Sequence, residues 1–523
     1  MKQANILLLF TDMQRADTIG ALGNPVIQTP NLDRLVHEGT AFTRCYSPSP
    51  VCVPARCCLQ YGLYPQRTGL FVNGRMMDDN GRSYPEVLSQ SGYTTAAIGK
   101  CHFTPDRLAR RGFDRRITQE EQISNYGEDD YRQWLLEKDL DPVEAHGERG
   151  PMYYIPQPSR FSGEAHPTGW IGERTIETIT EFAAGSNPWC LMSSFIHPHP
   201  PLTPPRGWTK LYPPHLMPGP HMPPHAESLL THINRTQNRY KWRDNGTDLN
   251  LLRTIRSYYY ATVSYIDYQV GRILESLENQ GILDDTLILF ASDHGEYLGD
   301  YGCYGKRSMH DASARVPLIA RLPGRFAPGT VCKDPASLVD IMPTMLAAAG
   351  IEATDLDGCD LKAVAGGTCD RQHVFSQWGK GRNAIYLIAS RDWKYIYSAG
   401  EEKEILFDRL NDPLESRNAA ADAEAFGIRR TLKQALLQYL KASGDDEAVE
   451  KSGGKLEWKA HPPLRQSYLA DNPDEGLLYQ DEAEGLPEAI GPFTFAKRPN
   501  DPEFAQQFEQ RLFYGDGSGR KPL

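Results

Sequence analysis

The sequence lacks the features that mark membrane-spanning or exported chains. No stretch of its 523 residues approaches the roughly 18 consecutive apolar residues of a membrane helix. The first residues, Met1 to Ile6, lack the apolar region and small-residue cleavage site of a signal peptide. We therefore expect a chain with no membrane partner that resides in the cytoplasm, or in the periplasm or outside the cell if a leader was removed.

Basic charge and paired cysteine motifs are also scarce. The chain has 56 basic and 67 acidic residues, for a formal net charge of -11 at pH 7. Because binding to a phosphate backbone needs a basic surface, we expect no nucleic-acid partner. Ten cysteines in a chain of this length do not resemble a disulfide scaffold, and their spacing contains no paired C-x-x-C zinc pattern.

Apolar runs alternate with helical patterns through the first 350 residues or so. The runs are nearly continuous, which is typical of strands covered on both faces. This alternation predicts an α/β domain with a largely parallel sheet. The expected strands are Ile6–Phe10, Thr94–Ile98, Trp189–Phe195, Thr286–Ala291 and Val316–Ala320. The expected helices are Leu32–His37, Tyr84–Ser91, Glu173–Ala184, Leu251–Glu278 and Leu338–Ala348.

The pattern changes after residue 370, which predicts three regions. Residues 1–370 form the main α/β domain, and residues 371–450 form a small subdomain with short strands and one helix. Residues 451–523 form a tail with little periodicity, which either packs across a partner subunit in a homo-oligomer or is mobile; packing is favoured. Two long segments rich in Pro, Arg, Asp and His, 104–170 and 200–248, are expected to line the entrance of the active site.

Three short motifs combine nucleophilic and metal-binding residue types. Asp12 follows the first apolar run and Asp293-His294 follows another, at the strand ends where open α/β sheets bind ligands. Asp and His carry the donors that a divalent cation needs. The third motif, Cys52-Val-Pro-Ala-Arg56, is short, and taken alone it is as compatible with a buried structural cysteine as with a reactive one.

Cys52-Val-Pro-Ala-Arg56 resembles the C-x-[PSA]-x-R signature of type I, formylglycine-dependent sulfatases, a family of the alkaline phosphatase superfamily. Three further elements resemble the same family in the same order: Gly99-Lys100-Cys-His102, Pro198-His199-Pro, and Gly305-Lys306. The resemblance covers residues 5–320 or so. It implies an alkaline-phosphatase-like sandwich with a large, mostly parallel central sheet flanked by helices, followed by a small C-terminal α+β subdomain.

The resemblance also implies two non-protein contributions to the site. Cys52 is expected to be converted to formylglycine, by a formylglycine-generating or an anaerobic sulfatase-maturing enzyme, and the aldehyde hydrate is the nucleophile. A divalent metal is expected on Asp12, Cys52, Asp293 and His294, most readily Ca²⁺, with Mg²⁺ or Mn²⁺ next. Met13 departs from the family pattern, because its thioether is a poor ligand for a hard cation. Either Gln14 or water fills that place, or the site has one ligand fewer.

The remaining roles follow from the same resemblance. Lys100 and Lys306 are expected to contact the sulfate, and His199 or Lys306 the leaving oxygen. His102 is expected to act as a base, and Arg56 to hold and orient the nucleophile. Weaker candidates for substrate contacts are Asn73, which is equally compatible with an Asn-Gly turn, and His310, placed one helical turn beyond Lys306.

The predicted function is hydrolysis of a sulfate monoester to an alcohol and inorganic sulfate. A phosphonate monoester or phosphodiester hydrolase with the same nucleophile is the first alternative, because both groups are tetrahedral; Lys100 and His102 favour the sulfatase. A catalytically silent binding protein is the second alternative, supported only by Met13. The expected substrate is a sulfated small molecule or carbohydrate.

Overall fold

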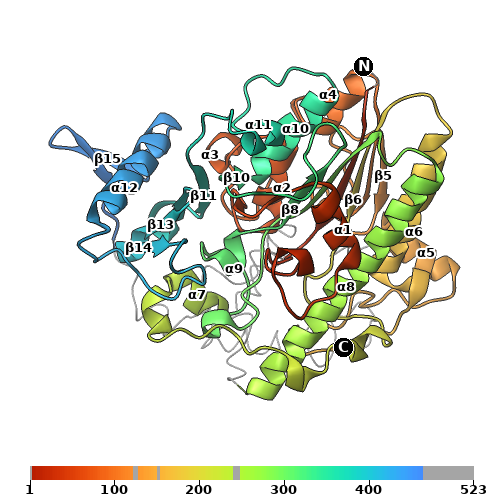
Figure 1. Cartoon of the computed structure of the whole chain (residues 1–523), viewed down its shortest axis with the longest axis horizontal. Coiled ribbons are helices and arrows are strands. Elements are labelled where there is room, and N and C mark those ends of the chain that lie inside the picture. The colour runs from red at the N-terminus through yellow and green to blue at the C-terminus, as the bar shows by residue number, and fades with distance from the viewer. Residues whose placement is uncertain (1–2, 122–127, 150–152, 239–247, 463–523) are drawn as a thin grey trace, which may run out of the picture.

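A large sheet crosses the main domain of the protein (Figure 1). The computed structural model describes residues 3–121, 128–149, 153–238 and 248–462. The eight strands lie in the order β5-β4-β6-β1-β7-β8-β2-β9, and β8 is antiparallel to both of its neighbours while all other pairs are parallel. The bounds are β1 Asn5–Thr11, β2 Thr40–Phe42, β4 Thr94–Gly99, β5 Arg115–Thr118, β6 Trp189–Ser194, β7 Thr286–Ser292, β8 Leu318–Arg321 and β9 Thr330–Cys332.

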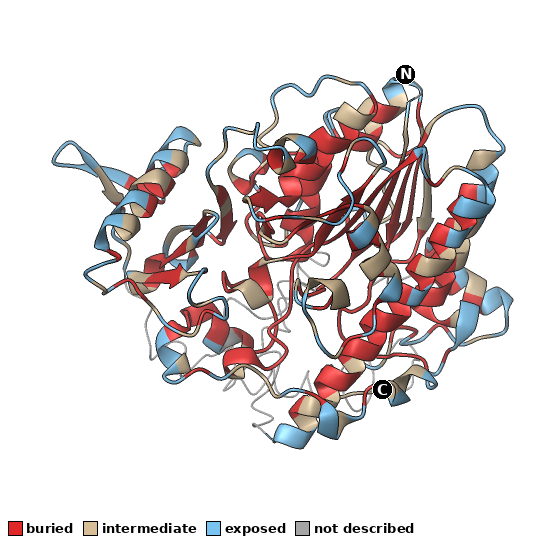
Figure 2. Cartoon of the chain, in the orientation of Figure 1, coloured by how far each residue is buried: buried red, intermediate tan, exposed pale blue. Residues whose placement is uncertain are grey.

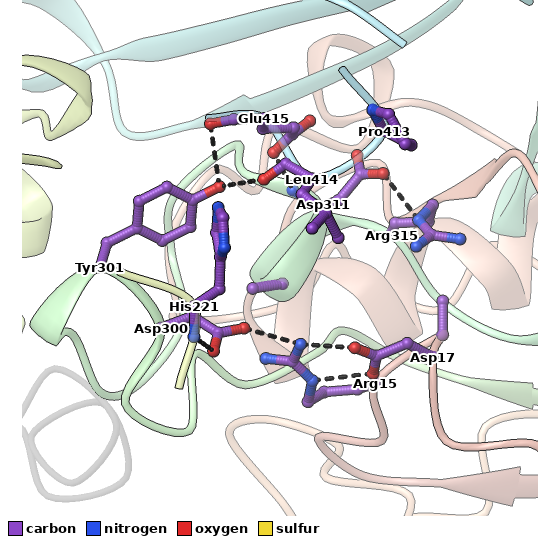
Figure 3. A pocket seen from close by; sticks show the side chains of 12 residues that line it. Arg15, Asp17, His221, Asp300, Tyr301, Asp311, Arg315, Pro413, Leu414 and Glu415 are labelled. Carbon is purple, nitrogen blue, oxygen red and sulfur yellow. Dashed lines mark hydrogen bonds and ion pairs between the residues drawn. The ribbon is translucent and has the colours of Figure 1, made fainter. Parts of the chain in front are cut away.

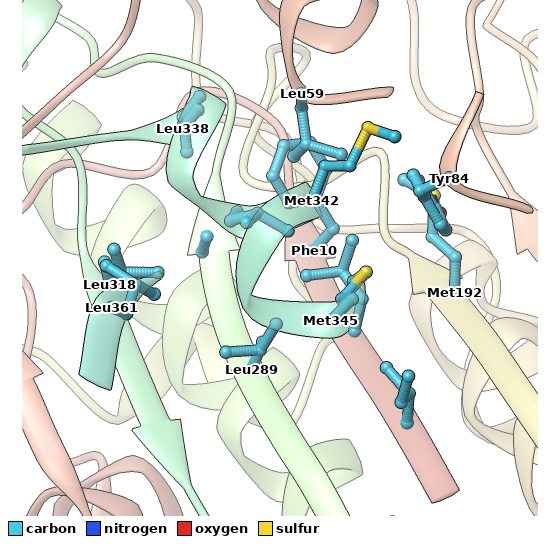
Figure 4. Close-up of a cluster of buried hydrophobic side chains, with 14 of the residues drawn as sticks. Phe10, Leu59, Tyr84, Met192, Leu289, Leu318, Leu338, Met342, Met345 and Leu361 are labelled. Carbon is cyan, nitrogen blue, oxygen red and sulfur yellow. Dashed lines mark hydrogen bonds between the residues drawn. The ribbon is translucent and has the colours of Figure 1, made fainter. Parts of the chain in front are cut away.

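Both faces of this sheet are covered, which explains the continuous apolar runs. Side chains alternate between the faces of a strand. In β1, Ile6, Leu8 and Phe10 belong to one buried cluster, and Leu7 and Leu9 belong to the cluster on the opposite face. Figure 4 shows the first cluster, in which Phe10 lies among side chains from the helices above it.

Helices from distant parts of the chain build the two covering layers. The layer over Leu7 and Leu9 contains α1 Pro30–Glu38, α5 Asp130–Glu137, α6 Pro167–Ala183 and α8 Leu249–Asn279. The opposite layer contains α2 Cys52–Tyr61, α4 Tyr84–Gln90, α10 Ile341–Ala348 and α11 Leu361–Ala365. Short elements complete the domain: α3 Pro65–Thr68, α7 His232–Gln237, α9 Asp311–Ala314, and the two-stranded sheet of β3 Cys45–Tyr46 with β10 Ala336–Ser337.

The longest described helix, α8, shows how sequence pattern becomes packing. Its apolar residues recur at three- and four-residue steps, and Leu252, Ile255, Ile266 and Ile273 are buried along one side. Asp248 accepts a hydrogen bond from the backbone N–H of Leu251 and caps the first turn. Figure 2 shows the buried side facing the sheet and the exposed residues facing outward. No helix in the described part of the chain is both long and apolar enough to cross a membrane.

The C-terminal region has its own small sheet. Strands β11 Val374–Trp378, β12 Ile385–Ala389, β13 Trp393–Ser398 and β14 Lys403–Asp408 pair antiparallel in that order. Helix α12 Phe426–Ala442 packs on this sheet, and the hairpin of β15 Val449–Ser452 and β16 Lys455–Trp458 follows. The predicted packing of the tail stays a prediction, because residues 463–523 lie outside the described residues.

The predicted strands and helices are all present, with ends that differ by a few residues in most cases. The segment 104–170 is more regular than predicted, because it contains β5, α5 and the start of α6. Strand β5 is an edge strand with the sequence Arg-Arg-Ile-Thr and only one buried residue, so it carries no apolar run to reveal it. Cys359 and Cys369 form a disulfide, and the other eight cysteines are buried and free.

Candidate active site

The carboxyl ends of four neighbouring strands lie at one edge of the main sheet. Asp12 directly follows β1, Asp293 and His294 follow β7, and Lys100 follows β4. The segment after β6 carries His199. Since β4, β6, β1 and β7 are adjacent and parallel, these side chains collect at the edge where open α/β sheets bind their ligands.

Cys52 reaches the same place from the N-terminus of α2, of which it is the first residue. Its Sγ lies 3.3 Å from His294 Nε2 and 2.9 Å from Lys306 Nζ. One ligand atom from each of Asp12, Cys52, Asp293 and His294 lies within 4.8 Å of the others, and all four residues are buried. The structure therefore brings together the four residues that were predicted to bind a metal.

The donor set of this cluster suits a divalent cation. His294 Nδ1 lies 3.1 Å from the carbonyl of Gly295, so a proton on Nδ1 leaves the lone pair of Nε2 for the cluster. Nε2 lies 3.4 Å from Asp293 Oδ1 and 3.8 Å from Asp12 Oδ1. The two carboxylates suit hard cations such as Ca²⁺, Mg²⁺ and Mn²⁺, whereas the imidazole is a ligand more typical of transition metals.

The pKa values of the two carboxylates are shifted in opposite directions. Burial, together with neighbouring Asp12, raises the pKa of Asp293 to about 7. Burial acts the same way on Asp12, but the cationic groups Lys100 and Arg56 outweigh it and hold the pKa of Asp12 well below its usual range. A cation bound between the two would favour the ionised form of both groups.

Arg56 connects the parts of the site through four hydrogen bonds. Its Nε donates to Asp293 Oδ2 at 3.0 Å and its Nη2 to Asp12 Oδ2 at 3.1 Å. Its Nη1 donates to the carbonyl of Lys100 at 2.7 Å and to Ser194 Oγ at 3.0 Å. The planar guanidinium therefore fixes the orientation of both carboxylates and leaves their Oδ1 atoms to face the cluster. The predicted contact with the nucleophile is not among these four bonds.

Lysines surround Cys52 without making it a thiolate. Lys100 Nζ lies 2.8 Å from Asp12 Oδ2 and also pairs with Glu121. Burial and Asp12 raise the pKa of Cys52 to about 12, although Lys306 and Lys100 oppose the shift. An unmodified Cys52 is accordingly a protonated thiol at neutral pH and a poor nucleophile.

Two histidines complete the group. His102 adopts a left-handed backbone with φ of 56°, and its buried Nδ1 has no hydrogen-bond partner among the described residues. His199 Nδ1 lies 2.7 Å from the carbonyl of Pro200, and its Nε2 lies 3.4 Å from the hydroxyl of Tyr153. Burial lowers the pKa of His199 to about 3, with Glu121 the strongest opposing influence.

Met13 is buried beside the cluster, with a left-handed backbone of φ 63°. Its N–H donates to Asp293 Oδ1 at 3.1 Å, and its Sδ lies 3.7 Å from Lys306 Nζ. The amide nitrogen of Gln14 donates to Thr18, whereas its buried Oε1 has no hydrogen-bond partner in the described part of the chain. The expectation that Gln14 or water takes the place of the missing ligand stays a prediction.

The two weaker candidates lie in different surroundings. Asn73 Oδ1 accepts the N–H of Val53 at 3.0 Å and so holds the first turn of α2, on which Cys52 sits. His310 was expected one helical turn from Lys306, but residues 305–310 are not helical, and Arg307 has a φ of 75°.

His310 instead lies 2.6 Å from the hydroxyl of Tyr297 through Nδ1, and its ring packs against Phe407 of β14. These contacts direct it toward the C-terminal sheet. The structure does not join it to the group around Cys52.

Glu120 and Glu121 were missed by the sequence analysis. Glu120 accepts hydrogen bonds from the backbone N–H groups of Cys101 at 2.8 Å and His102 at 3.1 Å, and thereby fixes the turn after β4. Glu121 pairs with Lys100, and its Oε1 accepts from Arg149 at 2.6 Å. In the sequence these residues appear as an adjacent acidic pair just after β5. The pair does not stand out, because the surrounding segment is rich in Arg and Asp.

Glu296, which follows the Asp293-His294 motif, also has a structural part in the site. Its Oε1 accepts the N–H of Gly305 at 2.6 Å, and its Oε2 accepts the hydroxyl of Tyr154 at 2.8 Å. Burial raises the pKa of Glu296 to about 7. By holding Gly305, this carboxyl group places the neighbouring Lys306 beside Cys52.

A separate pocket lies between the main domain and the loop after β14 (Figure 3). It contains none of the predicted site residues. Arg15 Nη2 pairs with Asp17 at 2.6 Å and with Asp300 at 2.8 Å, and the hydroxyl of Tyr301 donates to the carbonyl of Leu414 at 2.9 Å. Because its charges are matched in this way, we interpret it as a junction between the two regions.

Comparisons with known proteins agree with this architecture. The family model described as Sulfatase matches residues 4–351, which span all the predicted site residues, and the model described as N-sulphoglucosamine sulphohydrolase, C-terminal matches residues 299–442. A choline-sulfatase of Rhizobium meliloti is 32% identical, over 88% of this chain and 91% of its own length.

Solved structures share the fold at lower identity. A phosphonate monoester hydrolase from Silicibacter pomeroyi aligns with a TM-score of 0.72 and 22% identity, over 87% of this chain and 99% of its own. A structure in complex with its substrate D-glucosamine-2-N,6-O-disulfate aligns with a TM-score of 0.68 and 22% identity, over 85% and 99%. The predicted alkaline-phosphatase-like fold is thus confirmed. On the family match and the identity to choline-sulfatase, this chain is a sulfuric ester hydrolase of the sulfatase family in the alkaline phosphatase superfamily.

Proposed function

We propose that the protein hydrolyses a sulfate monoester to an alcohol and inorganic sulfate, with a formylglycine derived from Cys52 beside a bound divalent cation. The observation that carries this proposal is the position of Cys52. Its Sγ lies at the start of α2, 2.9 Å from Lys306 Nζ and within 4.8 Å of three potential metal ligands. Burial gives the unmodified thiol a raised pKa, which argues against a role as a thiolate nucleophile.

Asp12, Asp293 and His294 would hold the cation, and the side chain at position 52 would meet it. Ca²⁺ is proposed first because two carboxylates favour a hard cation, with Mg²⁺ or Mn²⁺ next. The formylglycine hydrate would supply an oxygen nucleophile, and the cation would offset negative charge on the sulfate.

The chain's own groups supply the remaining chemistry. Lys100 and Lys306 converge on the site and would bind the non-bridging sulfate oxygens, where fixed charge stabilises the transition state. Arg56 keeps both carboxylates oriented. His199 Nε2 would donate to the leaving oxygen, and His102 Nδ1, which has no partner among the described residues, would accept a proton.

A phosphonate monoester or phosphodiester hydrolase remains the second candidate, because the Silicibacter pomeroyi enzyme shares the fold and both transferred groups are tetrahedral. Lys100 and His102 favour the sulfatase. The substrate proposed is a sulfated small molecule or carbohydrate, in line with the names of the choline-sulfatase and of the glucosamine disulfate complex.

The decisive experiment begins with the intact mass of protein co-produced with a sulfatase-maturing enzyme. Conversion of Cys52 removes about 18 Da, whereas ordinary thiol oxidation adds oxygen mass. Converted protein is then assayed with aryl, alkyl and sugar sulfates and with a phosphodiester, before and after chelation. We expect sulfate release that follows the converted fraction. Turnover by unconverted protein, or a phosphodiester rate above every sulfate rate, contradicts the proposal.

A further inference from the structure

Glu121 lies between Lys100, which would contact the sulfate, and His199, which would contact the leaving oxygen. We propose that it is a positioning residue that holds Lys100 against the sulfate and His199 for protonation of the leaving oxygen, and so determines whether esters of weakly acidic alcohols are cleaved. This inference rests on the proposed sulfatase function. It assigns a task to a carboxylate that none of the recognised motifs contains.

Three cationic or protonatable groups meet at this one carboxylate. Its Oε2 pairs with Lys100 Nζ, and its Oε1 accepts from Arg149 Nη2 at 2.6 Å. Oε1 also lies 3.4 Å from His199 Nδ1. The side chains of Glu121 and His199 are only 8% and 3% exposed, so these interactions act in a buried environment where they are strong. Arg149 fixes the carboxylate in this position.

The hydrogen bonds of His199 determine which form can act as an acid. Nδ1 lies 2.7 Å from the carbonyl of Pro200, an acceptor, so Nδ1 carries a proton in the neutral ring. Nε2 then carries a lone pair and no proton, so it cannot donate to a leaving oxygen. Only the imidazolium form has a proton on Nε2. Because burial lowers the pKa of His199 to about 3, that form needs negative charge close by, from Glu121 and from the sulfate of the bound ester.

The charged neighbours of His199 show where that negative charge lies. Burial disfavours the imidazolium, and Lys306 and Lys100 disfavour it further. Glu121 and, more weakly, Asp12 favour it. Both carboxylates also pair with cations, but Glu121 is the one that lies within 3.4 Å of the ring, at Nδ1 of His199.

The consequence concerns the bond that breaks. As the nucleophilic oxygen at position 52 bonds to sulfur, the S–O bond to the alcohol would break and its electron pair would move to the alcohol oxygen. That oxygen takes the Nε2 proton and leaves a neutral imidazole, which solvent reprotonates after product release. A phenol with a low pKa leaves readily as its anion, without this proton. An ordinary alcohol has a high pKa, so its alkoxide leaves poorly unless it is protonated. Loss of Glu121 is therefore expected to slow alkyl sulfates far more than activated aryl sulfates.

The test compares Glu121→Gln with the wild type on a series of sulfate esters whose leaving groups range from a nitrophenol to a simple alkanol. For the alkyl ester we expect kcat to fall by roughly 10²-fold, within the range of general acid catalysis, and for the nitrophenyl ester by less than about fivefold. Glu148→Gln removes an exposed carboxylate from the residue next to Arg149 and serves as the matched control, with no selective loss.

Glu121→Asp keeps the charge but shortens the side chain by one methylene, so it should show a smaller selective loss of alkyl sulfate hydrolysis. It also replaces Glu121→Gln in the test if that variant does not fold. An equal loss on all esters for the folded variants overturns the inference while leaving the proposed function intact. An inactive wild type with fully converted Cys52 overturns the proposed function instead.

Discussion

Replacing Arg56 by Gln is expected to destabilise the metal-free protein by about 3–5 kcal/mol at pH 8, the usual cost of removing one partner of a buried ion pair. Arg56 is 3% exposed in its side chain, and it bonds to two fully buried carboxylates at 3.0 and 3.1 Å. Asp12 would retain Lys100 at 2.8 Å, but Asp293 would lose its only lysine or arginine partner among the described ion pairs. The penalty therefore arises mainly at Asp293.

The pH dependence of this loss has a definite sign. Burial and Asp12 already raise the pKa of Asp293 to about 7, and loss of Arg56 raises it further. When folding raises the pKa of a carboxyl group, the folded protein loses stability as the pH rises from the unfolded pKa of that group to its folded pKa. In the variant this pH range extends to higher pH. The loss in free energy of unfolding relative to wild type should therefore be larger at pH 8 than at pH 6, where Asp293 is protonated in both proteins.

Urea denaturation in EDTA, at pH 6 and pH 8, measures both quantities. Arg75→Gln is the matched control, because Arg75 pairs with Asp78 at the surface with side chains 71% and 88% exposed, and such pairs contribute about 0–1 kcal/mol. An Arg56→Gln protein as stable as the Arg75→Gln protein, or a deficit that does not grow with pH, would refute the reasoning.

Three further predictions follow from the same geometry. Cys52→Ser should bind substrate and stall as a stable sulfate ester, because serine provides only one hydroxyl; intact mass shows one added sulfo group, and full turnover would contradict the mechanism. Removal of divalent metal should lower both activity and the melting temperature, and Ca²⁺ should restore both, because the ligands at positions 12 and 293 are buried carboxylates; unchanged melting would argue against a metal there. Burial raises the pKa of Asp267 to about 6 despite its hydrogen bonds to the N–H groups of Asn31 and Leu32. Between pH 4 and 6, roughly, stability should therefore decline with rising pH by up to about 3 kcal/mol from this group, and Asp267→Asn should remove that slope in urea titrations.

Much of the fold was predictable because its strands are buried on both faces. The runs Ile6–Phe10 and Leu287–Ala291 are apolar throughout, and this pattern requires cover on each side. Asp12 and Asp293 were predictable for the same reason, since each directly follows such a run. Edge strand β5 and helix α5 were not, because half-exposed elements carry no comparable signal.

By itself the sequence therefore determined the α/β class, the strand ends that carry the candidate metal ligands, and the short motifs around Cys52, Lys100, His199 and Lys306. These are local properties, encoded by neighbouring residues along the chain.

Only the tertiary structure decided how the groups are paired. It showed that Arg56 bonds to both carboxylates, that Glu121 joins Lys100 to His199, and that His310 lies toward the C-terminal sheet. Such pairings join residues tens to hundreds of positions apart and depend on loop conformations, including the left-handed residues at Met13 and Arg307, which no periodicity in the sequence specifies.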